Sequence, residues 1–254
     1  MFDLEKYNIV DLSPRMIARI KRLDGTIEEG NADMFGLPWT LEEGVAPYDN
    51  TIFNFIGGLK DDEVWPWRLS GHFGSHTEGG RGHLDTWTEI PDSMQGLWEF
   101  PIETFLGEAV VCDVSSVTPV EGQDEEGKPA LISQPILPDH LDNVNAGDIV
   151  LMHGTETADG EPYIPGETAR WLSQKKIKML AVQMPGVMFE TDFQTQEPNN
   201  CPTHRAMLCN NIPITYPLVN ISTLKHERVF YLGLPLSVER LEASWIRAIA
   251  LEDK

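Results

Sequence analysis

The sequence predicts a single α/β domain with a mixed, curved β-sheet over residues 1–254. Short segments rich in β-branched and aromatic residues outnumber the helical segments. Residues 109–112 form a continuous apolar run, which is typical of a strand buried on both faces. A strand–helix–strand succession follows over residues 147–183. The chain contains no internal repeat and no low-complexity linker, and 41% hydrophobic residues are enough for a full core.

The N-terminal half is expected to contribute four strands. The first runs through residues 9–14 into a turn, and the second covers residues 51–56. The third covers residues 64–69, where Pro66 places it at a sheet edge or a bend. The fourth, residues 105–114, contains the apolar run and gives the strongest strand signal.

The C-terminal half contains the clearest helix, over residues 166–176. Ala169 and Leu172 supply its apolar side, and Lys175 and Lys176 stand where cations favour the helix dipole. A second, shorter helical segment is expected over residues 203–210. The strands expected in this half are residues 147–153, 177–183, 212–215, 228–235 and 245–250.

Charge and composition exclude several classes of protein. The formal net charge of −21 disfavours nucleic-acid binding, because phosphate contacts need clustered Lys and Arg. The sequence contains no run of eighteen apolar residues, so it predicts no membrane span, and the N-terminus lacks the layout of a signal peptide. We therefore expect a cytoplasmic protein with no membrane partner.

The three cysteines do not form a disulfide pattern. Cys112, Cys201 and Cys209 are odd in number and have no repeated spacing, which fits a reducing compartment. Cys201 and Cys209 flank His204, so a Cys/His metal cluster is an alternative to buried, inert thiols. No second matching Cys/His pair supports that cluster.

Residues 72–83 carry the densest chemistry in the chain. Three histidines and one carboxylate lie within twelve residues, together with four glycines. Imidazole nitrogen and carboxylate oxygen are ligands that suit zinc, manganese or iron. Glycine allows the backbone to fold tightly around a small object. The segment therefore predicts a divalent metal site.

His72, His76 and Glu78 are the candidate metal ligands. A site with three protein ligands leaves positions open for water and substrate, as a catalytic site requires. Such a metal would lower the pKa of bound water and polarise a carbonyl oxygen. The alternatives are two unrelated histidines and an ordinary solvated acid at Glu78.

His83 is the candidate proton shuttle, because a neutral imidazole has a suitable pKa for moving protons. It could instead be a third nitrogen ligand. Arg81 could bind a substrate carboxylate, but a solvated loop charge or a pair with Asp85 is the favoured interpretation. Nucleotide-binding glycine motifs are absent from the sequence, so no nicotinamide or nucleotide cofactor is implied.

The order His72-x-Gly74-Ser75-His76-x-Glu78 resembles the His-x-Gly-Thr-His-x-Asp motif of the metal-dependent cyclase family. That family includes bacterial kynurenine formamidases and isatin hydrolases. The resemblance extends through nearly the whole chain. It continues at residues 11–13, 147–151, 169–172, 204–208, 212–214, 218–220, 233–236 and 247–250.

The resemblance implies a swivelling β/β/α-type fold that is usually dimeric or tetrameric. It also implies zinc or manganese, and hydrolysis of an amide, lactam or similar carbonyl bond. His72, His76 and Glu78 would be the metal ligands. The family motif ends in a proton-transferring histidine, and His83 is its nearest counterpart in this chain.

The chain departs from the family pattern in three places. Glu78 replaces the usual aspartate, and His83 arrives one residue late, with Gly80 where proline is common. Members with two metals use a downstream histidine and glutamate, but here His204 is followed by Tyr216 at the glutamate position. We therefore expect one metal per chain. His204 would hydrogen-bond substrate or water, and Tyr216 would donate to a developing oxyanion.

The resulting hypothesis is a metal-dependent hydrolase of a small cyclic or aryl amide or a lactone. Its partner is a small carbonyl substrate, and we expect a homodimer or homotetramer. One alternative is a lyase or ring-closing cyclase that uses the same metal to stabilise an enolate. A second alternative is a non-catalytic protein that binds metal and a small molecule.

Overall fold

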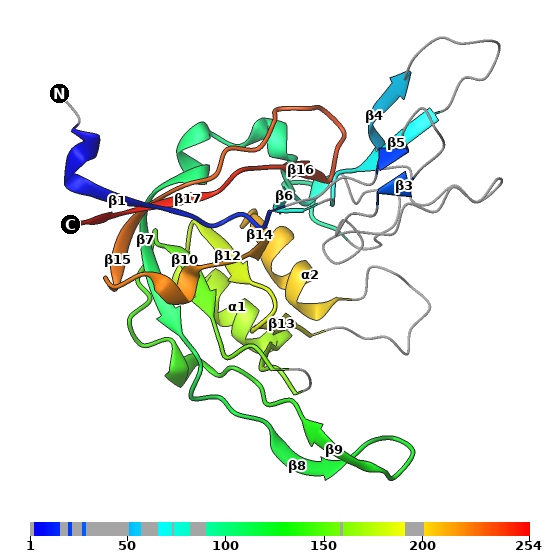
Figure 1. Ribbon diagram of the computed structural model, residues 1–254, viewed down its shortest axis with the longest axis vertical. Helices are drawn as coiled ribbons and strands as arrows, with labels where there is room; N and C mark the ends of the chain where they lie inside the picture. Colours follow the sequence, from blue (N-terminus) through cyan, green and yellow to red (C-terminus); the bar gives the residue numbers. More distant parts are fainter. Residues whose placement is uncertain are drawn as a thin grey trace.

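The structure of the protein is a computed structural model. It describes residues 3–15, 20–21, 27–28, 51–56, 66–72, 74–81, 90–157, 160–190 and 201–254. The described chain is organised around one nine-stranded sheet that curls on itself (Figure 1). In spatial order, its strands are β1 (Tyr7–Asp11), β17 (Ile249–Asp253), β15 (Arg228–Leu232), β7 (Leu106–Asp113), β10 (Ile149–His153), β12 (Met179–Gln183), β14 (Ile214–Leu218), β6 (His76–Glu78) and β16 (Ala243–Trp245).

The centre of this sheet is parallel and both flanks are antiparallel. Strands β7, β10, β12 and β14 run parallel to one another. Antiparallel pairing adds β15, β17 and β1 on one side. On the other side, β6 and then β16 are added in the same antiparallel manner. The mixed sheet that the sequence predicts is therefore confirmed.

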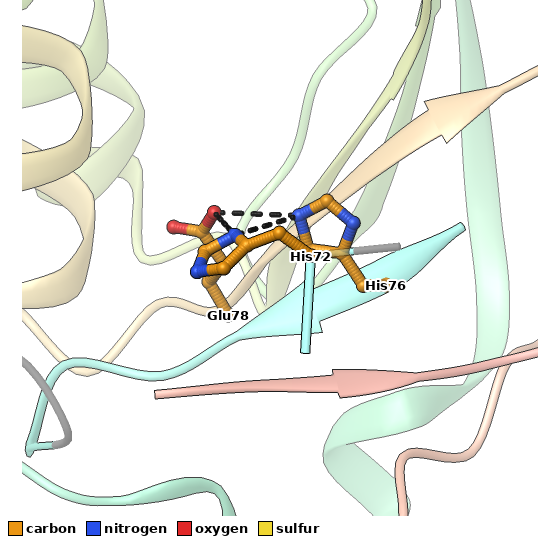
Figure 2. A group of neighbouring side chains, drawn as sticks. All are labelled: His72, His76 and Glu78. Atoms are coloured by element: carbon orange, nitrogen blue, oxygen red, sulfur yellow. Dashed lines mark hydrogen bonds and ion pairs between the residues drawn. The ribbon is translucent and has the colours of Figure 1, made fainter. Parts of the chain in front are cut away.

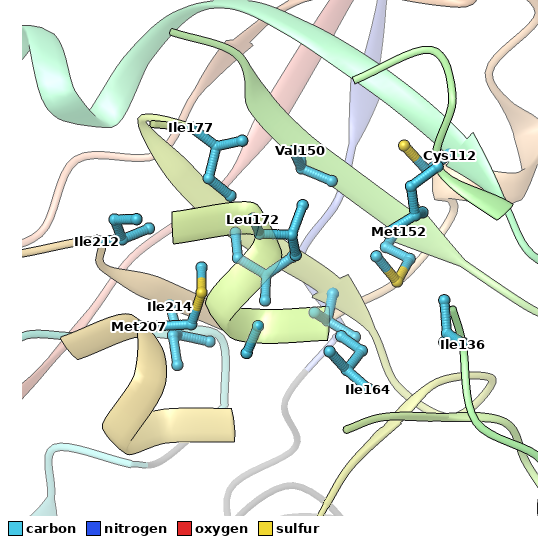
Figure 3. Close-up of a cluster of buried hydrophobic side chains, with 14 of the residues drawn as sticks. Cys112, Ile136, Val150, Met152, Ile164, Leu172, Ile177, Met207, Ile212 and Ile214 are labelled. Atoms are coloured by element: carbon cyan, nitrogen blue, oxygen red, sulfur yellow. The ribbon is translucent and has the colours of Figure 1, made fainter. Parts of the chain in front are cut away.

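The central strands are buried on both faces, as their continuous apolar runs predict. Along β10, Val150 and Met152 belong to one hydrophobic cluster, whereas Ile149 and Leu151 belong to another. This alternation follows from the two-residue period of a strand. The first cluster also contains Leu172 and Met207 from the two helices (Figure 3). The helices therefore cover one face of the sheet, and the second cluster fills the other.

Two α-helices pack against each other on that face. Helix α1 (Gly166–Lys175) ends where Lys176 adopts a left-handed backbone conformation with φ of 59°. Helix α2 (Pro202–Leu208) begins with proline, which is favourable in the first turn because its missing N–H has no helical partner there. Both helices lie close to the segments predicted from the sequence.

Four small two-stranded sheets complete the described strands. They are β2 (Ile20–Lys21) with β3 (Ile27–Glu28), β4 (Thr51–Ile56) with β5 (Pro66–Ser70), β8 (Val120–Gln123) with β9 (Pro129–Ile132), and β11 (Tyr163–Ile164) with β13 (Met188–Phe189). The β8–β9 hairpin projects away from the main sheet (Figure 1). Short 3₁₀ turns occur at Leu4–Lys6, Leu97–Glu99, Ile102–Phe105, Pro138–His140 and Ile221–Thr223.

One strand expectation is wrong. The sequence predicts a single strand over residues 245–250, but two strands border this region and residues 246–248 belong to neither. Strand β16 pairs with β6, whereas β17 pairs with β1 and β15. The two strands therefore lie at opposite flanks of the sheet, and the chain must cross between them. In the described part of the chain, no helix is long and apolar enough to cross a membrane.

Candidate metal site

Strand β6 presents two of the candidate ligands side by side. His76 and Glu78 are two residues apart, so the period of a strand places both on one face. Thr77 lies on the opposite face, where its hydroxyl is 2.8 Å from that of Thr215. His76 and Glu78 are almost fully buried, with 2% and 1% of their surface exposed. Pairing of β6 with β14 on one side and β16 on the other keeps both residues away from solvent.

His72 reaches the same place from the turn before β6. Gly74 has a φ of 63°, a left-handed conformation that glycine adopts at little cost, and it helps the chain reverse between His72 and His76. Gly71 lies so close to the neighbouring strand that a Cβ atom would come within 2.6 Å of the Ala243 carbonyl oxygen. Both glycines allow the half-buried His72 to pack against β6 and β16.

The three candidate ligand atoms form a small triangle (Figure 2). His72 Nδ1 lies 3.3 Å from His76 Nε2 and 3.1 Å from Glu78 Oε1, and the last two atoms are 3.4 Å apart. Bonds of about 2.0–2.2 Å to one metal would separate neighbouring ligand atoms by roughly 3–3.6 Å. Two imidazoles and a carboxylate at these separations fit a divalent zinc or manganese ion.

Each histidine also makes a hydrogen bond through its other ring nitrogen. His76 Nδ1 donates to the Gly74 carbonyl oxygen at 2.7 Å. His72 Nε2 donates to Glu242 Oε1, also at 2.7 Å. Carbonyl and carboxylate oxygens act here as acceptors, so each outer nitrogen carries a proton and the other nitrogen is directed at the triangle. This pattern is typical of histidines that bind metals in proteins.

Negative charge is concentrated around His72. Burial alone would lower the pKa of this histidine, but hydrogen bonds to Glu242 and Glu78 raise it to about 10. Burial would likewise raise the pKa of Glu78, yet nearby His204 and the hydrogen bonds from His72 and His76 hold it well below its usual value. The site is therefore one in which a carboxylate stays ionised and a cation is stabilised.

His204 and Tyr216 lie against Glu78. His204 comes from α2, and its Nε2 is 3.5 Å from Glu78 Oε2 and 3.4 Å from the Tyr216 hydroxyl. Tyr216 stands opposite His76 in the β14–β6 ladder and donates a short hydrogen bond to Glu78 Oε1. Burial and the charge of Glu78 raise the pKa of Tyr216 well above its ordinary value, so its hydroxyl keeps its proton.

The far side of His204 is held by a thiol and an aromatic ring. Cys201 Sγ lies 2.7 Å from His204 Nδ1 and donates to the Glu190 carbonyl oxygen at 2.8 Å. The Phe189 ring packs edge-on against both His204 and Tyr216. Burial raises the pKa of Cys201 to about 11, so this thiol stays protonated and acts as a neutral neighbour.

The structure brings together His72, His76 and Glu78 as the sequence predicts, and His204 and Tyr216, which the sequence also named, lie at the edge of the cluster. His83 lies outside the described residues. Within the described chain, Cys201, His204 and Cys209 do not gather three ligand atoms, so they form no Cys/His cluster there. Arg81 pairs with Glu99 at 2.6 Å and not with the cluster.

Glu242 was not anticipated from the sequence. It is 170 residues from His72 in the chain, and no local motif marks it. Its carbonyl oxygen accepts a hydrogen bond from the Gly79 backbone N–H at 2.8 Å, which places it beside β6. Only the pairing of β16 with β6 brings this acid to the site, and short-range patterns carry no signal for that pairing.

A family model described as "Putative cyclase" matches residues 10–187 of the chain. Among curated proteins, no match is found. Solved structures share the fold over nearly the full length. An isatin hydrolase bound to the product analogue thioisatinate has 18% identity and a TM-score of 0.63, covering 98% of this chain and 94% of its own.

Two further structures show the same relationship. Isatin hydrolase A from Labrenzia aggregata, bound to benzyl benzoate, has 17% identity, a TM-score of 0.60 and coverage of 98% of this chain and 95% of its own. A potential metal-dependent hydrolase with cyclase activity has 12% identity and a TM-score of 0.55, covering 98% and 99% of the two chains. At these identities the likeness establishes the fold alone.

Proposed function

Because this chain belongs to the cyclase family, we propose that it is a metal-dependent hydrolase that opens a small cyclic or aryl amide, or a lactone. One observation carries the proposal: His72, His76 and Glu78 present three ligand atoms at mutual distances of 3.1–3.4 Å. The outer nitrogen of each histidine is held by an oxygen acceptor, which suits metal ligands.

The metal would be one zinc or manganese ion per chain, held by these three residues. When bound, it would lower the pKa of a water molecule and polarise the substrate carbonyl. A second ion is disfavoured because Tyr216 keeps its proton, so a neutral phenol and not a carboxylate stands beside His204. His204 contacts the other oxygen, Glu78 Oε2, at 3.5 Å.

The chain's own residues would supply proton transfer and charge stabilisation. His204 holds Nε2 beside Glu78 and Tyr216, so it is placed to hydrogen-bond water or substrate and to protonate a leaving nitrogen or oxygen. Tyr216 keeps its proton, which it donates to Glu78 Oε1 in the structure; in the metal-bound site it would instead donate to negative charge that develops on the carbonyl oxygen. His83 remains our proposed acceptor of the proton from the attacking water.

The substrate class is suggested by the relatives. Structures named isatin hydrolases share this fold, and isatin contains a lactam fused to an aromatic ring. We propose a small carbonyl compound of this kind as the partner of the chain. We also propose a cytoplasmic homodimer or homotetramer with no nucleic-acid or membrane partner. Light scattering during size-exclusion chromatography would measure the assembly.

Metal content and turnover together test this function. The purified protein would be loaded with Zn²⁺ or Mn²⁺ and assayed on isatin, an aryl formamide and an aryl lactone. We expect one metal per chain and turnover of at least one substrate class. His76→Ala should remove the metal, whereas His226→Ala should not, because His226 is an exposed histidine on the loop before β15. Full metal content in His76→Ala would contradict the assignment.

Isotope labelling separates hydrolysis from the alternative chemistry. A hydrolase must place oxygen from water in the product, so a reaction in ¹⁸O-labelled water should yield product heavier by one label. A lyase or ring-closing cyclase would release product without obligatory incorporation. Stoichiometric metal with no turnover would instead favour a non-catalytic binding protein.

A further inference from the structure

The outer nitrogen of His72 contacts an acidic side chain, that of Glu242. The residue is 7% exposed, and its Oε1 lies 2.7 Å from His72 Nε2. It stands immediately before β16, whose first residue, Ala243, is in register with Glu78. The cluster and this carboxylate are therefore neighbours across two adjacent strands.

We infer that Glu242 is a positioning residue for the metal site, acting through His72. The inference rests on the proposed function, because it concerns how strongly the three ligands hold a metal. Glu242 is directed at the ring nitrogen that faces away from the triangle. Its role is to set the orientation and proton position of a ligand.

The Glu242 carboxylate determines which nitrogen of the His72 ring carries a proton. An ionised carboxylate only accepts hydrogen bonds, so Nε2 carries a proton when it contacts Glu242. Nδ1 is then the nitrogen that would lose its proton when a metal binds and offer its lone pair. A neutral neighbour that could both donate and accept would leave either nitrogen able to carry the proton. Glu242 removes this ambiguity.

Glu242 also fixes the orientation of the His72 ring. His72 lies in a turn and not in a strand, and it is the most exposed of the three ligands, with 25% of its side chain exposed. His76 and Glu78, in contrast, are fixed by β6. The bond to Glu242 ties His72 to the residue preceding β16, so that Nδ1 stays 3.1 Å from Glu78 Oε1.

Glu242 is itself anchored by a backbone hydrogen bond. Its backbone carbonyl accepts a hydrogen bond from the Gly79 N–H at 2.8 Å, one residue after Glu78. The side chain and main chain of Glu242 therefore contact the two ends of the motif, at His72 and at Gly79. Because the second contact uses the backbone, a substitution at Glu242 preserves it. The side-chain effect can thus be measured by itself.

The test is the affinity for Zn²⁺, measured by competition with a chromophoric chelator. Removal of an outer partner of a metal ligand typically weakens metal binding about 10- to 100-fold. We expect that loss in Glu242→Leu, which has a similar volume and no acceptor. Glu242→Gln keeps an oxygen acceptor for Nε2–H and should lose clearly less. A packing role would also lower the Tm of the metal-free chain, whereas a role through His72 lowers the affinity for Zn²⁺.

Glu239→Gln is the matched control. Glu239 is an exposed residue three positions before Glu242, and the substitution removes its charge in the same way. It should bind Zn²⁺ as the native chain does. Thermal unfolding in the presence of chelator verifies that each variant is folded. If Glu242→Leu does not fold, the Zn²⁺ affinity of Glu242→Gln is compared with that of the native chain instead. Unchanged affinity in both Glu242 variants would overturn this inference alone. Failure of the native chain to bind Zn²⁺ would overturn the proposed function and this inference with it.

Discussion

Tyr216 is the residue at which the chemistry of this chain differs most from the two-metal pattern. A phenol stands where the two-metal pattern has a carboxylate, and its hydroxyl donates a hydrogen bond to Glu78 Oε1. This hydrogen bond uses part of the acceptor capacity of the Glu78 carboxylate. We propose that a site built in this way holds one metal beside a hydrogen-bond donor.

We expect Tyr216→Phe to lower kcat about 10- to 100-fold, because a hydrogen bond to a charged group is worth about 1.5–3 kcal/mol. His72, His76 and Glu78 are unaltered by the substitution, so the metal content should stay at one per chain. Steady-state kinetics and metal analysis of the same preparation would check both parts. An unchanged kcat would show that Tyr216 has no role in the reaction.

Thr77 and Thr215 form a buried pair directly behind the cluster. Both are fully buried, their hydroxyls are 2.8 Å apart, and Thr215 Oγ1 also lies 3.5 Å from Met179 Sδ. We expect Thr77→Val to lower the free energy of unfolding by about 1–3 kcal/mol, because it removes the oxygen partner of the buried Thr215 hydroxyl.

The double variant Thr77→Val with Thr215→Val should cost less than the sum of the two single variants, since it removes both hydroxyls together. Chemical denaturation of all four proteins gives the coupling between the residues. Strict additivity would mean that the two hydroxyls do not depend on each other.

At the level of elements, the N-terminal strand is tied to the end of the chain. Strand β1 pairs with β17 along its full length, and Asp11 at its end contacts Arg247 with 2.6 Å between the carboxylate and guanidinium. The hydrogen bond from Arg247, aided by the Ser13 N–H, lowers the pKa of Asp11 below its ordinary value. The pair is exposed, so its contribution to stability is small.

The sign of the pH effect follows from that shift. A carboxyl group with a lowered pKa in the folded state stabilises the fold above its unfolded pKa, near 3.8. This contribution disappears as the pH falls through the folded-state value. We expect Asp11→Asn to be slightly less stable than the native chain at pH 6, with the difference shrinking once the pH falls below 3.8 and vanishing below the folded-state pKa. Urea unfolding across this pH range measures it, and a constant difference would contradict the assignment.

The elements themselves were largely predictable, because their signals are local. The apolar run at residues 109–112 lies inside β7, and the helix expected over residues 166–176 corresponds to α1. Spacing and glycine content also indicated the cluster of His72, His76 and Glu78. The single strand expected over residues 245–250 is wrong because strand propensity cannot show where a chain leaves one ladder for another.

Long-range pairing is the part that the sequence did not reveal. Glu242 reaches His72 only because β16 is the last strand beside β6, and Tyr216 faces His76 only through the β14–β6 register. Both contacts join residues more than 130 positions apart. Composition and spacing describe neighbours in the chain, and these partners are neighbours only in the sheet. The boundaries of the domain, residues 1–254, remain a prediction.

For the whole molecule, the position of the cluster couples metal binding to folding. The candidate ligands lie in β6 and the turn before it, between β14 and β16 at one end of the nine-stranded sheet. Glu242 connects the same turn to the chain before β16. A ligand that binds the folded chain and not the unfolded chain stabilises the folded state by mass action. A metal held there would thus stabilise one flank of the sheet.

We expect Zn²⁺ at about 100 times its dissociation constant to add about 2.7 kcal/mol to the free energy of unfolding. For a chain of this length, that gain raises the Tm by roughly 5–10 °C. Differential scanning calorimetry with Zn²⁺ and with chelator measures the shift. His76→Ala should show no rise, because a buried ligand from β6 is lost, whereas His226→Ala should retain it. Equal shifts in both variants would locate the stabilising metal outside this cluster.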